Sequence, residues 1–241
     1  MNTITQQPSN PATLLPFIHT LMANPMSGPD IEAKSFAVID TEARQPERPP
    51  AQWEVIRRAI HTTGDTSLAP FFHFSQDPIT AGIQALRAGA PIFCDSNMIR
   101  AGLSLARLRS VCPDYSPGHL SCHVADPDVA AEAKESGLPR SLFALRKARP
   151  ILDGGIVVFG NAPVALLELN RMIIEENIRP ALVIGMPVGF VHVEECKDEL
   201  LQISIPSIVI QGRRGGSPLA VSTIHAICTA AGWPSTGAPE A

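Results

Sequence analysis

Long apolar runs, paired cysteines and clusters of basic residues are all missing from this sequence of 241 residues. No stretch reaches the roughly 18 apolar residues that a membrane span needs, and residues 1–30 lack a basic segment followed by an apolar one. We therefore expect neither a membrane partner nor export. The 19 Lys and Arg residues are scattered and the formal net charge is −4, which disfavours nucleic acid as a partner.

The cysteines are few, odd in number and far apart in the sequence. There are five of them and no CxxC pair: Cys94, Cys112, Cys122, Cys196 and Cys228. This pattern disfavours both a disulfide framework and a structural zinc site. We expect reduced thiols, a cytoplasmic location and no bound metal.

The composition is that of a folded globular protein. Hydrophobic residues make up 45% and charged residues 17%, and the length suits one large α/β domain. Residues 1–30 and 232–241 carry Pro, Ser, Asn and Gly without periodicity, so we predict an irregular N-terminal extension and a C-terminal tail around a body at 31–231. Residues 45–50 are predicted to be a connecting loop.

Short aliphatic runs alternate with amphipathic stretches along the body. The runs at 90–95, 155–160, 181–186 and 207–212 are typical of buried strands. Such alternation predicts a three-layer α/β fold, a mainly parallel sheet with helices on both faces. Pro50 is expected to open one of the helices and Gly64 to close it.

Glycine-containing loops follow the four predicted strands, at the edge of the sheet where ligands of α/β proteins bind. Glycine allows close approach of a ligand to the backbone, and helix N-termini favour anions such as carboxylates or phosphates. The candidate ligand-binding residues in these loops are Asp95, Asn161, Gly189, Arg213, Gly215 and Gly216. Tight turns also require glycine, Asp95 could instead cap the next helix, and Arg213 could be a solvated surface charge. Neither GxGxxG nor GxxxxGK[ST] is present, so a dinucleotide or P-loop site has no specific support.

His61 is the candidate acid or base. It follows Arg58 by three residues, so both side chains lie on one face of the predicted helix. Imidazole titrates near neutral pH, with a reference pKa of about 6.5, and can donate or accept a proton there. A helix-capping or surface role is the alternative, and the other candidate histidines are His73, His123, His192 and His225.

Three further residues, Arg140, Ser141 and Cys94, are of types that can take part in binding or catalysis. Arg140 and Ser141 begin a predicted helix after Gly137, and a guanidinium there could pair with a carboxylate. Cys94 could be a nucleophile, but a cysteine at the end of a buried strand is better explained as a small apolar residue.

Seven phrases, read together and in register, resemble the precorrin-8X methylmutase family of cobalamin biosynthesis. They are KSFAVID at 34–40, IHTTGD at 60–65, GAPIFCD at 89–95, GNAP at 160–163, GMPVGFV at 185–191, KD at 197–198 and GRRGGS at 212–217. The resemblance covers about 31–231. It departs from the family pattern at Pro139, where a Thr is expected, and at residues 73–78.

The resemblance implies an α/β homodimer that moves a methyl group from C11 to C12 of a tetrapyrrole, converting precorrin-8X to hydrogenobyrinate. It implies that His61 is the proton donor and acceptor, that Ser35 and Arg58 contact the substrate, and that Arg140 matches an Arg-Ser motif. No cofactor is expected, because the shift is intramolecular. Two alternatives stay open: the cobalt-bearing substrate of the anaerobic route, and a non-catalytic corrinoid carrier on the same fold.

Overall fold

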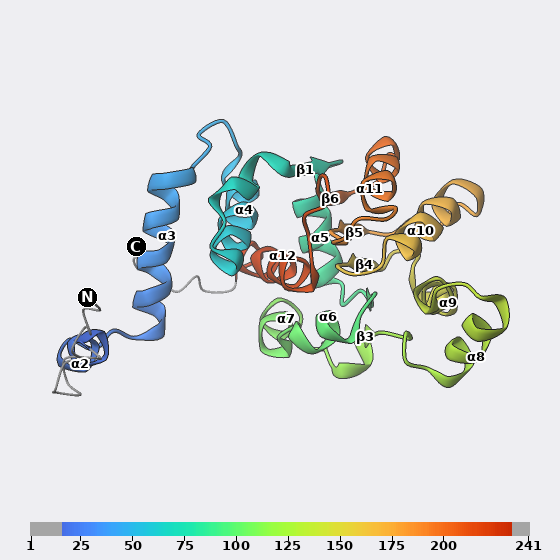
Figure 1. Ribbon diagram of the computed structural model, residues 1–241, viewed down its shortest axis with the longest axis horizontal. Helices are drawn as coiled ribbons and strands as arrows, with labels where there is room; N and C mark the ends of the chain where they lie inside the picture. Colours follow the sequence, from blue (N-terminus) through green and yellow to red (C-terminus); the bar gives the residue numbers. More distant parts are fainter. Residues whose placement is uncertain (1–15, 233–241) are drawn as a thin grey trace, which may run out of the picture.

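A six-stranded sheet forms the centre of the protein. Its architecture is known from a computed structural model, which describes residues 16–232 (Figure 1). The strand order is β1-β6-β5-β4-β2-β3, and only the β1–β6 pair is antiparallel. The strands are β1 (Phe72–Ser75), β2 (Ile92–Cys94), β3 (Leu120–Ser121), β4 (Ile156–Phe159), β5 (Leu182–Gly185) and β6 (Ser207–Ile210). The predicted mainly parallel sheet is confirmed.

Helices cover both faces of the sheet, with α4, α5 and α12 on one side and α9, α10 and α11 on the other (Figure 1). The α-helices are α2 (Pro16–Ala23), α3 (Gly28–Ala43), α4 (Pro50–Thr63), α5 (Pro78–Arg87), α6 (Asn97–Gly102), α7 (Leu105–Val111), α8 (Pro127–Ser136), α9 (Arg140–Lys147), α10 (Pro163–Glu175), α11 (Val193–Gln202) and α12 (Ser217–Ala230). Short 3-10 turns are η1 (Thr66–Phe71), η2 (Pro117–His119) and η3 (Arg149–Ile151).

Side chains of the central strands alternate between two apolar cores. On β4, Ile156 and Val158 belong to the core under α4 and α12, whereas Val157 and Phe159 belong to the core under α10 and α11. All four are fully buried. A strand whose two faces are both covered needs apolar residues throughout, which explains the continuous aliphatic runs in the sequence. The three-layer, single-domain α/β prediction is confirmed.

The helix that carries His61 has the predicted limits. Pro50 occupies the first turn of α4, where its missing N–H costs nothing. Gly64 follows the last turn with φ 68° and donates its N–H to the carbonyl of Ile60 at 2.7 Å. Glycine suits this left-handed C-terminal position because it has no Cβ.

The N-terminal segment differs from the irregular extension that was predicted. Residues 16–23 form α2, and α3 begins at Gly28 because Ser27 caps it. The Ser27 hydroxyl accepts the N–H of Asp30 at 3.2 Å, and the Asp30 carboxylate accepts the N–H of Ser27 at 3.2 Å. This reciprocal pair satisfies two donors that a helix end leaves open. Residues 1–15 and 233–241 of the predicted tails lie outside the described residues.

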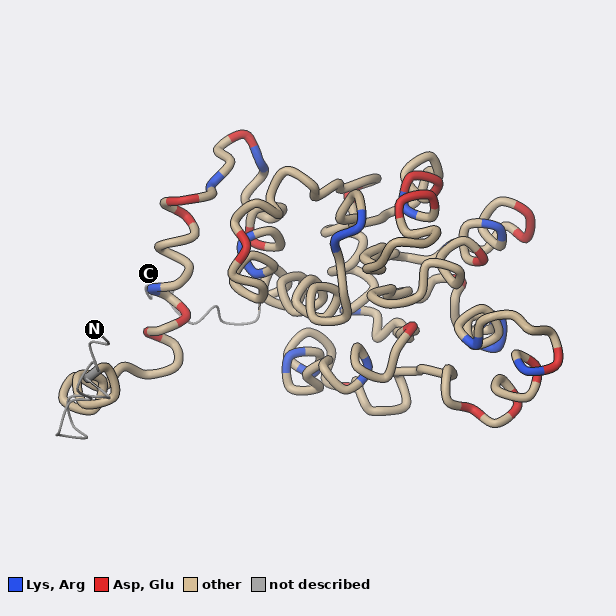
Figure 2. Tube along the Cα trace, in the orientation of Figure 1, with Lys and Arg blue, Asp and Glu red and all other residues tan. Residues whose placement is uncertain are grey.

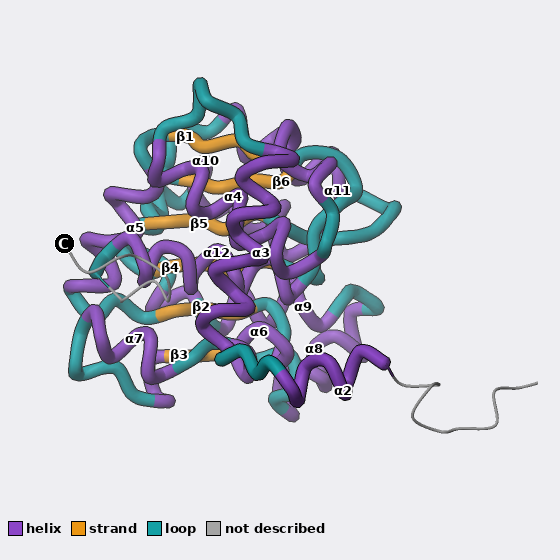
Figure 3. Tube along the Cα trace, turned by 90° about the vertical axis from the view of Figure 1, so that its left-hand side faces the viewer, coloured by secondary structure: helices purple, strands orange, loops and turns teal. Residues whose placement is uncertain are grey.

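Seen from the side, α3 crosses in front of the stacked strands and α2 extends beyond them (Figure 3). Among residues 16–232, no helix has both the length and the apolar character that crossing a bilayer requires.

Candidate active site

Helices α3 and α4 form an antiparallel pair tied together by polar contacts on one side. Trp53 donates its indole N–H to Asp40 at 2.6 Å, and the Arg57 guanidinium pairs with the other oxygen of Asp40 at 3.0 Å. Near the opposite end of α3, Arg58 pairs with Glu32 at 3.1 Å. These links fix the helix that carries His61 against its neighbour.

His61 lies in the last turn of α4, with its ring exposed. The imidazole meets the buried ring of Phe36 edge-on, with 5.2 Å between ring centroids. Phe36 also lies under the guanidinium groups of Arg57 and Arg58, at 4.4 Å and 5.3 Å from its centroid. One face of His61 is thus supported by protein, and the rest of the ring is accessible.

Two open hollows share His61 as a lining residue. The first, of about 370 Å³, is lined by Gly28, Pro29, Ile31, Glu32 and His61. The second, of about 410 Å³, is lined by Ser35, Val38, Ile39, Glu42, Ile60, His61, Gly64 and Thr66. The structure therefore brings the predicted residues Ser35 and His61 to one surface. The Ser35 hydroxyl donates to the carbonyl of Ile31 at 2.9 Å and can still accept a hydrogen bond.

Arg58 is buried, although the family resemblance implies that it contacts the substrate. Only 7% of it is exposed, and it pairs with Glu32. It also lies close enough to Arg107 of α7 to lower the pKa of that guanidinium, after the larger effect of burial. This geometry gives Arg58 a part in positioning α4 and leaves little of it for direct contact with a ligand.

Asp95 is 2% exposed, and its carboxylate organises the neighbouring strand end. One oxygen accepts the N–H groups of Gly160, Asn161 and Ala162, at 3.1, 2.7 and 2.7 Å. Burial raises its pKa, an effect that these three N–H groups oppose. A carboxylate that is buried and occupied in this way does not match the expected ligand contact of Asp95. Asp95 does not cap the next helix either, because Ser96 accepts the N–H of Ile99 and caps α6.

The segments that follow β2 and β4 both contact the start of α12. The hydroxyls of Ser96 and Ser217 lie 3.0 Å apart, and a Cβ at Gly160 would lie 2.7 Å from the Cα of Ser217. Glycine at 160 is therefore required by the close approach of the chain before α12. Asn161, next in the loop, is exposed and accessible to a ligand.

The loop before α12 is held from beneath by Lys197, whose side chain is fully buried. Its ammonium donates to the carbonyls of Gly212 and Arg214, both at 2.7 Å, and burial lowers its pKa to about 8. A Cβ at Gly215 would lie 2.2 Å from the carbonyl oxygen of Met186, so only glycine fits there. The candidates Gly215 and Gly216 thus form a rigid turn against β5.

The two arginines of this loop point to different neighbours. Arg213 pairs with Glu194 at 2.8 Å and lies over the ring of Phe190, just after the candidate Gly189. Arg214 donates to the Ser67 hydroxyl at 2.8 Å, which joins the loop to the segment that follows His61 and Gly64. The sequence indicated both arginines of this loop as candidate carboxylate clamps, whereas the buried Lys197 was not singled out as a site residue.

Arg140 and Ser141 begin α9 as expected, but α8 and α9 lie across the sheet from α3 and α4 (Figure 1). Arg140 is exposed beside a separate hollow of about 530 Å³ that Lys134 and Leu138 also line. Within one chain, the structure does not bring Arg140 and Ser141 next to His61.

None of the five thiols, all free and buried, is poised as a nucleophile. Burial raises the pKa of Cys196 and of Cys228 to about 12 and also raises the pKa of Cys94 and Cys122. Thiolate chemistry needs the opposite shift. The interpretation of Cys94 as a small apolar residue agrees with its burial.

Comparison with known proteins identifies the family. The family model described as precorrin-8X methylmutase matches residues 30–230. A cobalt-precorrin-8 methylmutase from Leptospira interrogans is 41% identical, covering 83% of this chain and 92% of the relative, and a precorrin-8X methylmutase from Pseudomonas aeruginosa is 37% identical, covering 84% and 95%. A solved precorrin-8X methylmutase from Thermus thermophilus superposes with a TM-score of 0.75 at 42% identity, covering 83% of this chain and 95% of that one. The chain therefore belongs to the precorrin-8X methylmutase family and is an isomerase of cobalamin biosynthesis.

Proposed function

We propose that this enzyme converts precorrin-8X to hydrogenobyrinate by moving a methyl group from C11 to C12, with His61 as the proton donor and acceptor. The observation that carries this proposal is the exposed imidazole of His61 at the meeting point of two hollows, one of which also contains Ser35. An acid or base must reach the reacting ring, and this histidine is accessible while Phe36 supports it from behind.

The reaction requires two things of the protein: a proton donor placed at the ring, and tight binding of the macrocycle. The bond from the methyl group to C11 breaks as the bond to C12 forms within one molecule, so no nucleophile is consumed. This agrees with the raised pKa values of the buried thiols. Protonation of a pyrrole-type nitrogen by His61 would redistribute the electrons of the conjugated ring, and return of that proton to the imidazole would restore the enzyme.

Residues that could hold the peripheral carboxylates surround the carboxyl edge of the sheet. Asn161 and Arg213 are exposed there, and the turn at Gly215 and Gly216 is held rigid by Lys197. Donors fixed by the fold lose little entropy when they bind, which favours precise placement of the macrocycle. Ser35 would add a hydroxyl from α3, and Gly189 would allow close approach of the ring.

A homodimer is part of the proposal. Ile31 and Val38 are 48% and 54% exposed on α3, and each lines a hollow that contains His61. A second copy over this surface would bury both side chains and enclose the ring, and could bring its Arg140 and Ser141 to a site that lacks them within one chain. A cytoplasmic location is supported by the free thiols.

The cobalt-bearing substrate is the second candidate, because the Leptospira relative, 41% identical, is named for it. The test offers purified enzyme precorrin-8X and, separately, cobalt-precorrin-8, and follows the visible spectrum for each product. We expect faster turnover of precorrin-8X. Faster turnover of cobalt-precorrin-8 would assign the enzyme to the anaerobic route instead. If the folded protein converted neither substrate, the proposed function would be overturned.

A further inference from the structure

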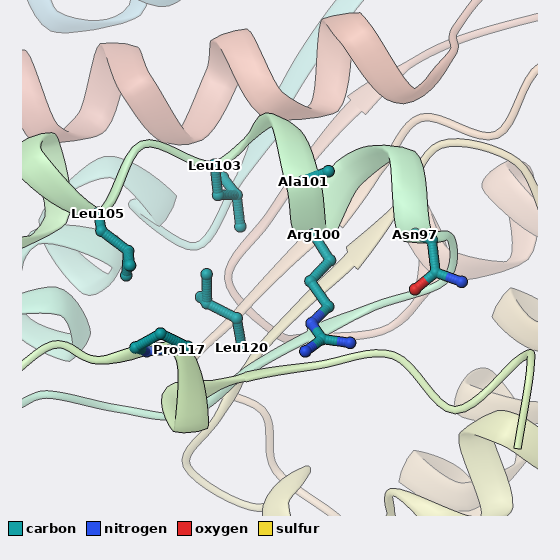
Figure 4. A pocket seen from close by; sticks show the side chains of 7 residues that line it. All are labelled: Asn97, Arg100, Ala101, Leu103, Leu105, Pro117 and Leu120. Atoms are coloured by element: carbon teal, nitrogen blue, oxygen red, sulfur yellow. The ribbon is translucent and has the colours of Figure 1, made fainter.

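A pocket lies between α6, the start of α7 and η2 (Figure 4). It has a volume of about 360 Å³, and its lining is apolar at one end and polar at the other. Leu103, Leu105, Leu120 and Pro117 gather at one end, while Arg100 and Asn97 project from α6 at the other. Leu103 and Leu120 are buried, so the apolar end of the pocket is held in place by the protein core. Pockets of this kind bind ligands that are apolar along most of their length and polar at one point.

The polar end of the pocket is basic. Within residues 16–232, the Arg100 guanidinium makes no hydrogen bond or ion pair, and the same is true of the Asn97 amide. Residues 97–111 contain three arginines, Arg100, Arg107 and Arg109, and no acidic residue. Figure 2 shows this run of basic positions along α6 and α7. A planar guanidinium that is free to form two parallel hydrogen bonds favours a carboxylate.

The pocket lies beside the loops that follow the sheet's parallel strands. Asn97, which lines it, comes directly after Ser96, whose hydroxyl lies 3.0 Å from that of Ser217. Ser217 in turn follows the candidate ligand-binding residues Gly215 and Gly216. A large ligand held at these loops could therefore extend an arm into the pocket.

We propose that the pocket takes one peripheral acid arm of the macrocycle, with Arg100 and Asn97 on its carboxylate and the leucines on its methylene groups. An aliphatic acid arm has the same division between an apolar stem and an anionic end as the pocket lining. This inference rests on the proposed function and adds Arg100 and Asn97 to the residues that hold the substrate. A free short-chain carboxylate shares the chemistry, so the test must distinguish the two sources.

The experiment titrates the full-length protein with hydrogenobyrinate, followed by visible absorbance, in the wild type and in Arg100→Gln, Arg100→Lys and Arg44→Gln. Arg44→Gln removes the same charge from an exposed position after α3. We expect Arg100→Gln to weaken binding by roughly 10- to 100-fold, because a charged hydrogen bond is lost, and Arg100→Lys to weaken it less. Arg44→Gln should bind like the wild type.

Kinetics and a small probe complete the test. In turnover assays, Arg100→Gln should raise KM while kcat changes by less than about 3-fold. The reason is that Arg100 would bind the acid arm equally well in the ground state and in the transition state. Equal binding and KM in Arg100→Gln and wild type would overturn the inference, as would propionate that binds the wild type without competing with hydrogenobyrinate. Failure of the wild type to convert any precorrin would instead count against the proposed function, because binding of the macrocycle is measured separately.

Discussion

The ring of Phe36 on α3 packs edge-on against the imidazole of His61 on α4, with centroids 5.2 Å apart. Phe36 is 5% exposed, so it belongs to the core while it supports the candidate catalytic side chain. We predict that Phe36→Ala lowers the free energy of unfolding by about 3 kcal/mol, because a large buried ring is replaced by a cavity. Urea denaturation measures this, with Phe36→Leu as the milder control. A loss below about 1 kcal/mol would show that α3 contributes little to the core.

His61→Ala tests the proton transfer. We predict a kcat lower by roughly 10²- to 10⁴-fold, the usual contribution of a general acid or base, with binding of hydrogenobyrinate changed by only a few fold. His19→Ala, on the exposed surface of α2, is the matched control and should leave kcat unchanged. Full activity of His61→Ala would mean that another group supplies the proton.

Asp95→Ala tests whether this carboxylate is structural. Removal of Asp95 leaves three backbone N–H groups without their acceptor, so we predict a loss of about 3 kcal/mol or more in the free energy of unfolding. Asp114→Ala, at an exposed position, removes the same charge and should change stability by less than about 0.5 kcal/mol. A stable Asp95→Ala protein with weakened binding of hydrogenobyrinate would restore the ligand contact predicted from the sequence.

His225 should make the free energy of unfolding depend on pH, with a sign that its environment determines. Its imidazole accepts the N–H of Ser104 at 3.0 Å, and burial, with smaller effects of Arg107 and Arg58, lowers its pKa to about 4. Between pH 6.5 and 4 the unfolded chain binds a proton that the folded chain does not. The contribution of His225 to stability is therefore present above pH 6.5 and falls as the pH drops to 4.

Replacement of His225 by Gln should remove this dependence, because Gln can still accept the Ser104 N–H and does not titrate. We predict that the wild type loses stability relative to His225→Gln between pH 7 and pH 4.5, measured by urea denaturation at each pH. Parallel curves for the two proteins would show that His225 does not keep its neutral form in the fold.

Val38→Asp tests the proposed homodimer. A charge at this exposed position on α3 would be buried in an interface over the hollows, so we predict a shift from dimer to monomer in light scattering after size-exclusion chromatography. Ile174→Asp, on α10 across the sheet and 63% exposed, should leave the mass unchanged. A monomeric wild type would overturn the dimer proposal directly.

Local patterns were enough to identify much of the scaffold. The four aliphatic runs became β2, β4, β5 and β6, because residues buried on both faces of a sheet must be apolar throughout. The limits of α4 followed from Pro50 and Gly64. Strands β1 and β3 lie at the edges of the sheet and were not predicted. Strand β3 has only two residues, and three of the four residues of β1 are only partly buried, so neither strand is a continuous aliphatic run. The start of α3 at the Ser27–Asp30 capping box was not predicted, because the surrounding prolines and glycines are typical of irregular chain.

Patterns along the chain were enough to predict the fold class, the family resemblance and the position of His61 near the end of a helix. What each polar side chain faces became known from the three-dimensional arrangement. Asp95 turned out to hold three N–H groups of a neighbouring strand end, Arg58 to pair with Glu32, and Lys197 to support the glycine loop from within the core. A buried polar side chain finds its hydrogen-bond partners on segments that are far away in the sequence. The spacing of residues along one strand or helix shows which face a side chain is on, but it does not show which distant segment packs against that face.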